Sequence, residues 1–411
     1  MSLMQPDTVH SSKASPMRIL HVIGTLNPAA GGPTESVRML LGYRDLGYEG
    51  EVVTLDDPGA PFLQDLPFRV HALGPQTSVY GFNRKLLPWL RENRDRFDGV
   101  VVNGLWQYTG LATLWTIKGH RPYMVFTHGM LDPYFKHRYP LKHIKKWLYW
   151  VPAEYWILRG AYRVLFTCKA ESELAKQSFW LHSWKPYVVP YGAQGSTGDR
   201  DQMVESFFEV CPGVRHKRYL LFLGRIDRKK GCDLLIEAFA ATALLDPGLH
   251  LVMAGPDARN WRPKLVERAV KSGCADRIHW PGIVLGDVKW GAFYGSEAFI
   301  LPSHQENFGI AVAEALSCGK PTLLSDKVNI APEISLEGAG YMEPDTVAGT
   351  EALLRRWIQT TSEERREMSD NALAIFRSRY DMRENAKAIM RLFELAAIHA
   401  GELPALATDM R

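Results

Sequence analysis

The stretch YLLFLGRIDRKKG at residues 219–231 is the part of the chain that decides its fold. Five apolar residues followed by a glycine are typical of a buried parallel strand that ends in a loop. The loop is rich in cations and closes at Gly231, where a helical pattern begins. We therefore expect Arg225 and Lys230 at the carboxyl end of a strand, facing a cleft, where an arginine fork and a compact ammonium suit a diphosphate. The alternative is a solvated basic turn.

A second motif reads ENFGIAVAEAL at residues 306–316 and follows an apolar run at 298–301. Its spacing predicts a helix that begins near Gly309. The first amides of a helix have no internal partner and its dipole is positive there, so this end suits an anion. Glu306 precedes the helix and Glu314 lies inside it. A glutamate in so apolar a helix needs a partner, either ligand hydroxyls or a structural arginine.

Short apolar runs alternate with helical patterns along the chain, which predicts an α/β fold of two domains, each with a parallel sheet covered by helices on both faces. A helix that begins near Pro33 is expected to end at Gly47, and residues 362–399 are expected to be helical. The predicted organisation is an N-terminal tail at 1–16, a first domain at 17–192, a linker at 193–215, a second domain at 216–375, a C-terminal helix at 376–400 that crosses back to the first domain, and a frayed tail at 401–411.

Composition limits the classes of protein to which the chain can belong. Its 411 residues allow two to three domains at about 150 residues each. A hydrophobic content of 46% and a charged content of 23% exclude a disordered or collagen-like chain, and a net charge of +4 excludes a histone-like nucleic-acid binder. The basic surplus is local, because residues 121–190 hold 11 Lys and Arg against 4 Asp and Glu.

No targeting signal or disulfide framework is expected. The five cysteines form no C-x-x-C pair, and residues 1–16 lack the apolar core of a signal peptide. The uncharged stretch at 99–117 contains glycine and amide residues, so it predicts a strand and a helix rather than a membrane span. These features favour a cytoplasmic protein.

Taken together, the motifs resemble those of the retaining nucleotide-sugar glycosyltransferases of family 4, which have the GT-B fold of two Rossmann-like domains facing a cleft. The resemblance covers most of residues 17–399. It depends on G-R-x-x-x-x-K-G at 224–231, on E-x7-E from Glu306 to Glu314, and on the Ala-Gly-Pro turn at 254–256.

The resemblance implies a role for each matching residue. Arg225 and Lys230 would hold the donor diphosphate, Glu306 the hydroxyls of the transferred sugar, and Glu314 the ribose. The amides of residues 308–310 would complete the phosphate cradle, and the base would lie near Ile283. The implied donor-binding residues are Gly31, Gly32, Gly255, Ile283, Asn307, Phe308, Gly309, Ile310 and Glu314.

Two features of the first domain fit the same resemblance. Gly31-Gly32 looks like the family's glycine loop, which lets the backbone approach the donor phosphates or the acceptor, although a plain turn is an equal alternative. His128, in the sequence FTHG, matches a family histidine near the transferred sugar, although a lone histidine is more often a hydrogen-bonded core residue. With His128, the expected catalytic groups are Arg225, Lys230 and Glu306.

The segment at 134–150 is basic, aromatic and free of acids. Such an amphipathic segment can lie on an anionic membrane, which fits a family that often uses lipid-linked acceptors. The alternative is a solvated helix whose aromatic side chains enter the core. The expected membrane or acceptor surface consists of Lys136, Arg138, Lys142, Lys145, Lys146 and Trp147.

The sequence contains no G-x-x-x-x-G-K-[ST] loop and no HExxH or CxxC pattern, so we expect neither a metal nor another cofactor. The predicted activity is retaining transfer of a hexosyl group from a UDP- or GDP-sugar to a glycan, expected to be lipid-linked, in bacterial polysaccharide synthesis at the inner face of the plasma membrane. No nucleic-acid partner is expected. The alternatives are a nucleotide-sugar epimerase on a similar scaffold and a non-catalytic glycan-binding subunit.

Overall fold

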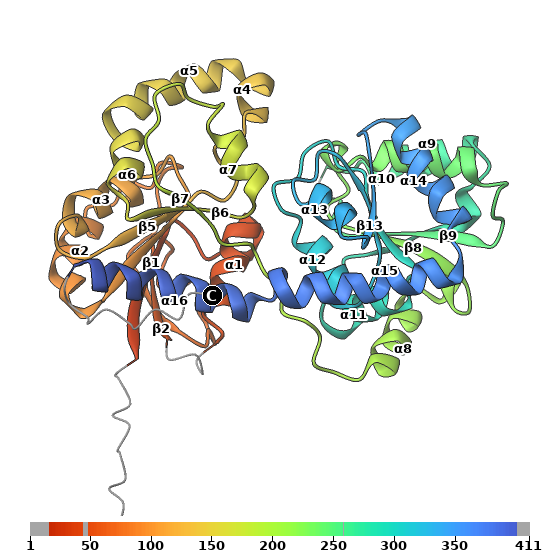
Figure 1. Cartoon of the computed structure of the whole chain (residues 1–411), viewed down its shortest axis with the longest axis horizontal. Helices are drawn as coiled ribbons and strands as arrows, with labels where there is room; N and C mark the ends of the chain where they lie inside the picture. Colours follow the sequence, from red (N-terminus) through yellow and green to blue (C-terminus); the bar gives the residue numbers. More distant parts are fainter. Residues whose placement is uncertain (1–15, 44–47, 258, 401–411) are drawn as a thin grey trace, which may run out of the picture.

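The computed structural model describes residues 16–43, 48–257 and 259–400 and contains two parallel β-sheets, each flanked by helices (Figure 1). The predicted α/β class is confirmed. The predicted tails at 1–16 and 401–411 lie almost entirely outside the described residues.

The first sheet has seven strands in the order β3-β2-β1-β4-β5-β6-β7. Its central strands β1, β4 and β5 are almost fully buried, as expected for strands covered on both faces. The bounds are β1 Met17–Ile23, β2 Tyr48–Thr54, β3 Arg69–Ala72, β4 Gly99–Asn103, β5 Tyr123–Phe126, β6 Arg163–Phe166 and β7 Pro186–Val188.

The second sheet has six strands in the order β10-β9-β8-β11-β12-β13. The bounds are β8 Arg218–Leu223, β9 Leu249–Ala254, β10 Ile278–Gly282, β11 Ala298–Leu301, β12 Thr322–Ser325 and β13 Gly340–Glu343. Strand order reverses direction beside β1 in the first sheet and beside β8 in the second. Ligands of such sheets bind beyond the carboxyl ends of the strands at this point.

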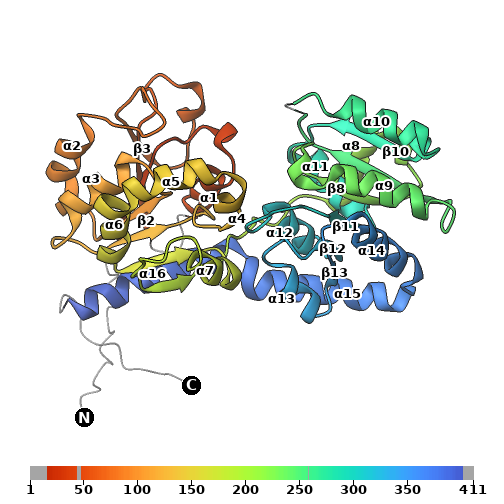
Figure 2. The same ribbon diagram turned by 90° about the horizontal axis from the view of Figure 1, so that it is seen from above.

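Helices cover both sheets, and those expected to begin near Pro33, Gly231 and Gly309 do so (Figures 1 and 2). Those of the first part of the chain are α1 Gly32–Leu40, α2 Leu86–Asn93, α3 Tyr108–Ile117, α4 Tyr134–Arg138, α5 Pro140–Tyr149, α6 Tyr155–Gly160, α7 Lys169–Ala175 and α8 Arg200–Val210. Those that follow are α9 Cys232–Thr242, α10 Arg262–Lys271, α11 Gly286–Gly295, α12 Ile310–Ser317, α13 Ala331–Leu336, α14 Val347–Gln359, α15 Ser362–Ile375 and α16 Met382–His399.

Two local expectations were wrong, and two strands were missed. The helix that begins near Pro33 ends at Leu40, well before Gly47, which lies outside the described residues. The edge strands β3 and β13 were not predicted, because partly exposed edge strands lack a continuous apolar run. The predicted helical segment at 362–399 is divided by a π-helical turn at Phe376–Tyr380 and the extended residue Asp381.

The chain crosses between the two domains twice, and the two crossings are hydrogen-bonded to each other. The backbone amide of Ala193 donates to the carbonyl of Tyr380 at 2.9 Å, and the amide of Met382 donates back to Ala193 at 3.4 Å. Beyond this point α16 packs on the first domain, where the ring of Phe393 leaves no room for a side chain at Gly99. Figures 1 and 2 show α15 and α16 spanning both domains.

Candidate active site

A cavity of about 640 Å³ lies between the two domains, at the carboxyl ends of β5, β8 and β11. Most of the residues predicted from the sequence line it, although they come from distant parts of the chain. They are Gly31, Gly32, His128, Arg225, Lys230, Glu306, Asn307, Phe308, Gly309, Ile310 and Glu314.

The basic loop after β8 forms one wall of this main cavity. Asp227 shapes the loop, because its carboxylate accepts a hydrogen bond from the amide of Lys229 at 2.9 Å. Gly231 closes the loop in the left-handed region at φ 68°, where a Cβ would overlap the carbonyl of Pro302. Arg225 is exposed and has no ion-pair partner among the described residues.

Lys230 is paired with a carboxylate. Its ammonium contacts Glu306, and both side chains keep only 17% exposure. A bound anion would therefore meet one unpaired cation, Arg225, and a second one already neutralised by Glu306.

The amino end of α12 forms the next part of the wall. Gly309 precedes the helix at φ 81°, and the amides of Ile310 and Ala311 follow it where a helix offers no internal acceptor. Phe308 is buried, with its ring 5.6 Å from that of Tyr191 and 5.4 Å from that of Tyr380. The loop is thus anchored by Phe308 while the helix end faces the cavity.

Glu314, one turn further along α12, is buried and paired with Lys289 of α11 at 2.6 Å. Burial raises the pKa of Glu314, and the ammonium of Lys289 opposes that rise. The partner of Glu314 is thus a lysine, whereas the sequence suggested either ligand hydroxyls or a structural arginine. Nothing in the sequence around Lys289 marks it as this partner, because the two residues come from separate helices.

His128 follows β5 and has a left-handed backbone at φ 52°. Its ring stacks on Phe126 with centroids 4.6 Å apart. Nδ1 is bonded to the hydroxyl of Tyr191, and Nε2 lies 3.2 Å from Oδ1 of Asn103. Burial lowers the pKa of His128 to about 3, so the imidazole is neutral at pH 7.

Sequence reasoning missed Glu171, which organises the loops around His128. Its buried carboxylate accepts hydrogen bonds from the amide of Gly129 and the hydroxyl of Thr127, both at 2.6 Å, and from the amide and hydroxyl of Thr167 at 2.6 and 2.7 Å. It also lies 3.3 Å from the side-chain amide of Asn307, in the second domain. Glu171 therefore joins the ends of β5 and β6 to the loop before α12.

The same loop makes further contacts across the domains. Gln305 donates to Asp132 at 2.7 Å, and Asn307 donates to Thr167 at 2.9 Å. Asn307 lines the main cavity, but its side-chain amide is engaged with the first domain. These contacts hold the two domains together around the cavity.

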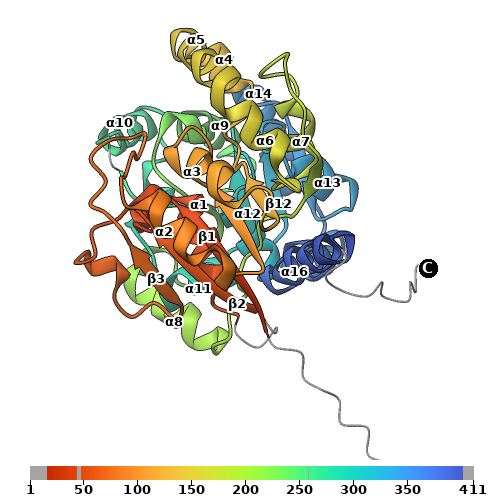
Figure 3. The same cartoon turned by 90° about the vertical axis from the view of Figure 1, so that its left-hand side faces the viewer.

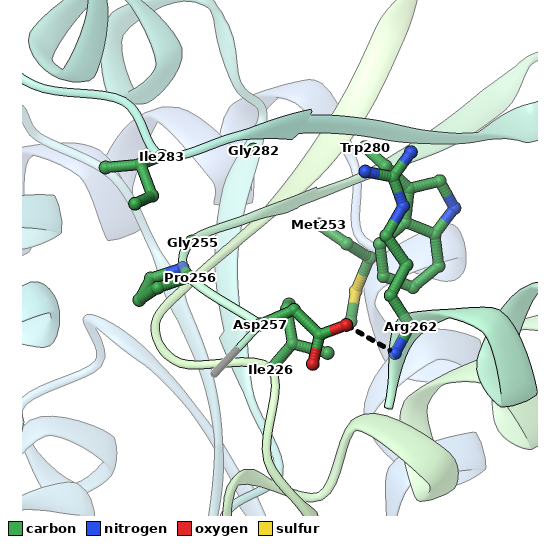
Figure 4. A pocket seen from close by; sticks show the side chains of 9 residues that line it. All are labelled: Ile226, Met253, Gly255, Pro256, Asp257, Arg262, Trp280, Gly282 and Ile283. Carbon is green, nitrogen blue, oxygen red and sulfur yellow. Dashed lines mark hydrogen bonds between the residues drawn. The ribbon is translucent and has the colours of Figure 1, made fainter. Parts of the chain in front are cut away.

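Gly255 and Ile283 lie outside the main cavity, in a pocket of about 360 Å³ that adjoins it at Pro256 (Figure 4). At Gly255, φ is 137° and a Cβ would overlap the carbonyl of Gly224, so only glycine fits. Figure 4 shows Arg262 reaching across Trp280, with its guanidinium carbon 5.5 Å from the ring centroid. We call this hollow the adjoining pocket.

The basic aromatic segment forms α4 and α5, at an outer edge of the first domain (Figures 1 and 3). Lys136, Arg138, Lys142 and Lys145 are exposed. Trp147 instead packs on Phe179 and Trp180, with centroids 5.0 and 5.4 Å apart. The ammonium of Lys146 lies 4.3 Å from the centroid of Trp106, and burial lowers its pKa to about 8.

The outward face of α5 is apolar, which the sequence alone did not show. Leu141, Ile144 and Leu148 are 77%, 60% and 77% exposed. Their spacing places them on one side of the helix. Trp180 continues this exposed surface, which we call the α5 ridge, at 81% exposure.

Two kinds of feature are absent from the described residues. Residues 16–43, 48–257 and 259–400 contain no group of three or more His, Cys, Asp or Glu arranged to hold a metal ion. Within the same ranges, no helix is both long and apolar enough to cross a bilayer.

Two family models match the chain, one in each domain. The "Glycosyl transferase 4-like domain" matches residues 31–192, and "Glycosyl transferases group 1" matches residues 209–374. Together they cover the main cavity from both sides.

Curated relatives match a shorter part of the chain. A D-inositol 3-phosphate glycosyltransferase of Actinosynnema mirum is 35% identical over 177 residues, which is 41% of this chain and 42% of that protein. A mannosylfructose-phosphate synthase of Agrobacterium fabrum is 31% identical over 184 residues, which is 41% of this chain and 38% of that protein. The chain thus spans less than half the length of these relatives.

Solved structures resemble the fold over nearly the whole chain. HepE of Anabaena, in complex with UDP and glucose, has a TM-score of 0.69 and 18% identity and covers 94% of this chain and 100% of its own. A glycosyltransferase of Rickettsia africae has a TM-score of 0.73 and 15% identity and covers 93% of this chain and 99% of its own. At 18% and 15% identity, the similarity to these structures shows a shared fold and nothing more specific.

Proposed function

Since the chain belongs to glycosyltransferase family 4 and has the GT-B fold, we propose that it transfers a hexosyl group from a nucleotide diphosphate sugar to a glycan hydroxyl, with retention at the anomeric carbon. The observation that carries the proposal is the wall of the main cavity. It combines Arg225, Lys230 and the amino end of α12 on one side of a cleft between two domains.

The diphosphate, the ribose and the base of the donor each fit a different group of residues in the cleft. The diphosphate lies between the basic loop and the first amides of α12, because both supply positive charge. The ribose lies near Glu314, where the Lys289 pair leaves carboxylate lone pairs for hydroxyl donors. The base enters the adjoining pocket between Ile283 and Trp280. The structure of HepE with UDP supports a uridine donor.

The difficult step is departure of the nucleotide diphosphate as the sugar becomes oxocarbenium-like. Arg225, Lys230 and the helix end stabilise the negative charge that grows on the leaving phosphate. The acceptor oxygen attacks on the face from which the phosphate leaves, and its proton passes to that phosphate. The C–O bond to the phosphate breaks, the new glycosidic bond forms, and configuration is retained. These groups take the place of a metal ion in the proposal.

The acceptor is proposed to be a lipid-linked glycan of bacterial polysaccharide synthesis, reached by docking the α5 ridge on an anionic membrane at the inner face of the plasma membrane. The ridge exposes apolar side chains, and Lys142 and Lys145 flank them in the arrangement expected of an interfacial helix. Apolar burial and attraction to acidic headgroups then act together.

Calorimetry with UDP and GDP in buffer containing EDTA tests the donor site. We expect heat of association with one nucleotide, stronger for UDP, and its loss in Arg225→Ala. No association with either nucleotide would contradict the proposal. A transferase also releases nucleotide faster when acceptor is added. An epimerase converts the donor sugar without any acceptor, and a glycan-binding subunit neither releases nucleotide nor converts the donor.

Flotation with vesicles tests the membrane surface. Replacing Leu141, Ile144 and Leu148 by serine is expected to abolish binding to vesicles rich in anionic lipid, and replacing Lys142 and Lys145 by glutamine is expected to weaken it and remove its salt dependence. The same changes at exposed Leu336 and Lys264 provide matched controls. Equal flotation of all variants would refute membrane docking through the α5 ridge.

A further inference from the structure

A chain of hydrogen-bonded polar side chains crosses the middle of the first sheet and ends at the main cavity. The hydroxyl of Tyr48 contacts Nε2 of His21, and Nδ1 of His21 lies 3.3 Å from Nδ2 of Asn103. Oδ1 of Asn103 lies 3.2 Å from Nε2 of His128, whose Nδ1 is bonded to the hydroxyl of Tyr191. Such a polar path through an apolar core is tolerated when its members satisfy one another.

The side-chain amide of Asn103 can adopt only one orientation in this path. Its Nδ2 lies 3.2 Å from the carbonyl oxygen of Val101, which can accept a hydrogen bond but cannot donate one. The two hydrogens of Nδ2 therefore go to Val101 and to Nδ1 of His21. The carbonyl oxygen Oδ1 is left facing His128, and it too can only accept.

The tautomer of each histidine follows from this orientation. Because Oδ1 of Asn103 accepts, Nε2 of His128 carries the proton. Burial keeps His128 neutral, so its Nδ1 has a lone pair and accepts a hydrogen bond from the hydroxyl of Tyr191. His21 is neutral for the same reason and donates from Nε2 to the oxygen of Tyr48, because its Nδ1 accepts from Asn103.

We propose that Asn103 is a positioning residue that holds His128 in the Nε2–H tautomer, so that its Nδ1 is available only as an acceptor. Its expected effect on turnover rests on the proposed function. Both His128 and Tyr191 line the main cavity, whereas Asn103 lies behind them in the sheet. A group that reaches Nδ1 from the main cavity must therefore donate a hydrogen bond to it.

The tautomer is measured directly by two-bond ¹H–¹⁵N correlation spectra of the full chain labelled with ¹⁵N-histidine, in which protonated and unprotonated ring nitrogens have distinct shifts. We expect His128 at pH 7 to be neutral with its proton on Nε2. In Asn103→Leu the signals should move toward a mixture of tautomers. Tyr191→Phe leaves the hydrogen bond between His128 and Asn103 in place and should therefore keep the Nε2–H tautomer of His128. Asn385→Leu removes a buried asparagine that bonds to neither histidine and serves as the matched control.

A wild-type His128 that is protonated on Nδ1, or on both nitrogens, would overturn the proposal, even if Asn103→Leu failed to fold. A folded Asn103→Leu variant with an unchanged His128 tautomer would remove Asn103 from the positioning role. Turnover of Asn103→Leu should fall by about five- to tenfold, as for loss of one hydrogen bond. A protein with the expected tautomer that binds no nucleotide would contradict only the proposed function.

Discussion

Removing the ammonium of Lys230 is expected to slow sugar transfer by on the order of 10²-fold or more. This group lies on the wall of the main cavity beside Glu306. Two unit charges about 4 Å apart interact by about 4 kcal/mol at an effective dielectric constant of about 20. If half a charge develops on the leaving phosphate, the barrier rises by about 2 kcal/mol, which is roughly 30-fold in rate. The carboxylate of Glu306, left without its partner, repels the phosphate and adds the remainder.

Release of nucleotide from the donor, measured at saturation with a coupled assay, gives turnover for Lys230→Ala and for two comparison variants. Arg228→Ala removes the same charge from the same turn, but Arg228 is exposed and does not line the main cavity. We expect Arg228→Ala to retain nearly full turnover. Lys230→Ala,Glu306→Gln should recover part of the lost rate, because the repelling carboxylate is gone.

Turnover of Lys230→Ala within about threefold of wild type, a difference worth less than about 1 kcal/mol, would refute the electrostatic account of this site. An equal loss in Arg228→Ala would do so as well, because the effect would then be one of overall charge.

Three further predictions concern stability. Glu171→Gln places a donor among the groups that now donate to the carboxylate, and urea denaturation should show a loss of about 3 kcal/mol. By the same measurement, Gly255→Ala should cost about 3 kcal/mol or more of stability, because its Cβ would meet a backbone carbonyl. The control Gly273→Ala has φ 68° but open space around the Cβ, so it should cost about 1 kcal/mol. Equal losses in the two variants would contradict the overlap at Gly255. Burial lowers the pKa of His21 to about 3, so the unfolded chain binds this proton below pH 6.5 while the folded chain does not. The free energy of unfolding should therefore decrease as the pH is lowered from 6.5 toward 3, by about 2 kcal/mol at pH 5 from His21 alone. His21→Gln should make this dependence of stability on pH shallower.

Local patterns in the sequence were sufficient to predict the main cavity. The basic loop and the E-x7-E helix each follow a buried strand, and parallel strands bring their carboxyl ends together, so Arg225, Lys230 and Glu306 were expected to meet. The alternation of strands and helices predicted two α/β domains, and the resemblance to glycosyltransferase family 4 implied the GT-B fold.

What was missed depends on contacts between residues far apart in the chain. Lys289 pairs with Glu314 from another helix, and Glu171 joins three loops from the start of α7. Neither residue belongs to a motif, so only the folded arrangement reveals its partners. The outward direction of Leu141 and Leu148 was hidden for a similar reason, because the packing of Trp147 and Lys146 decides which side of α5 turns inward.

The paired crossings at Ala193 and Tyr380 have a consequence for limited proteolysis. A protease that nicks the connection between Gln194 and Asp199 cuts one of two covalent routes between the halves, but α15 and α16 still join them. The nicked protein should therefore run as two fragments on a denaturing gel and as one particle on a sizing column. The fragment that begins after the nick would carry α16 and so remain docked on the first domain through Phe393.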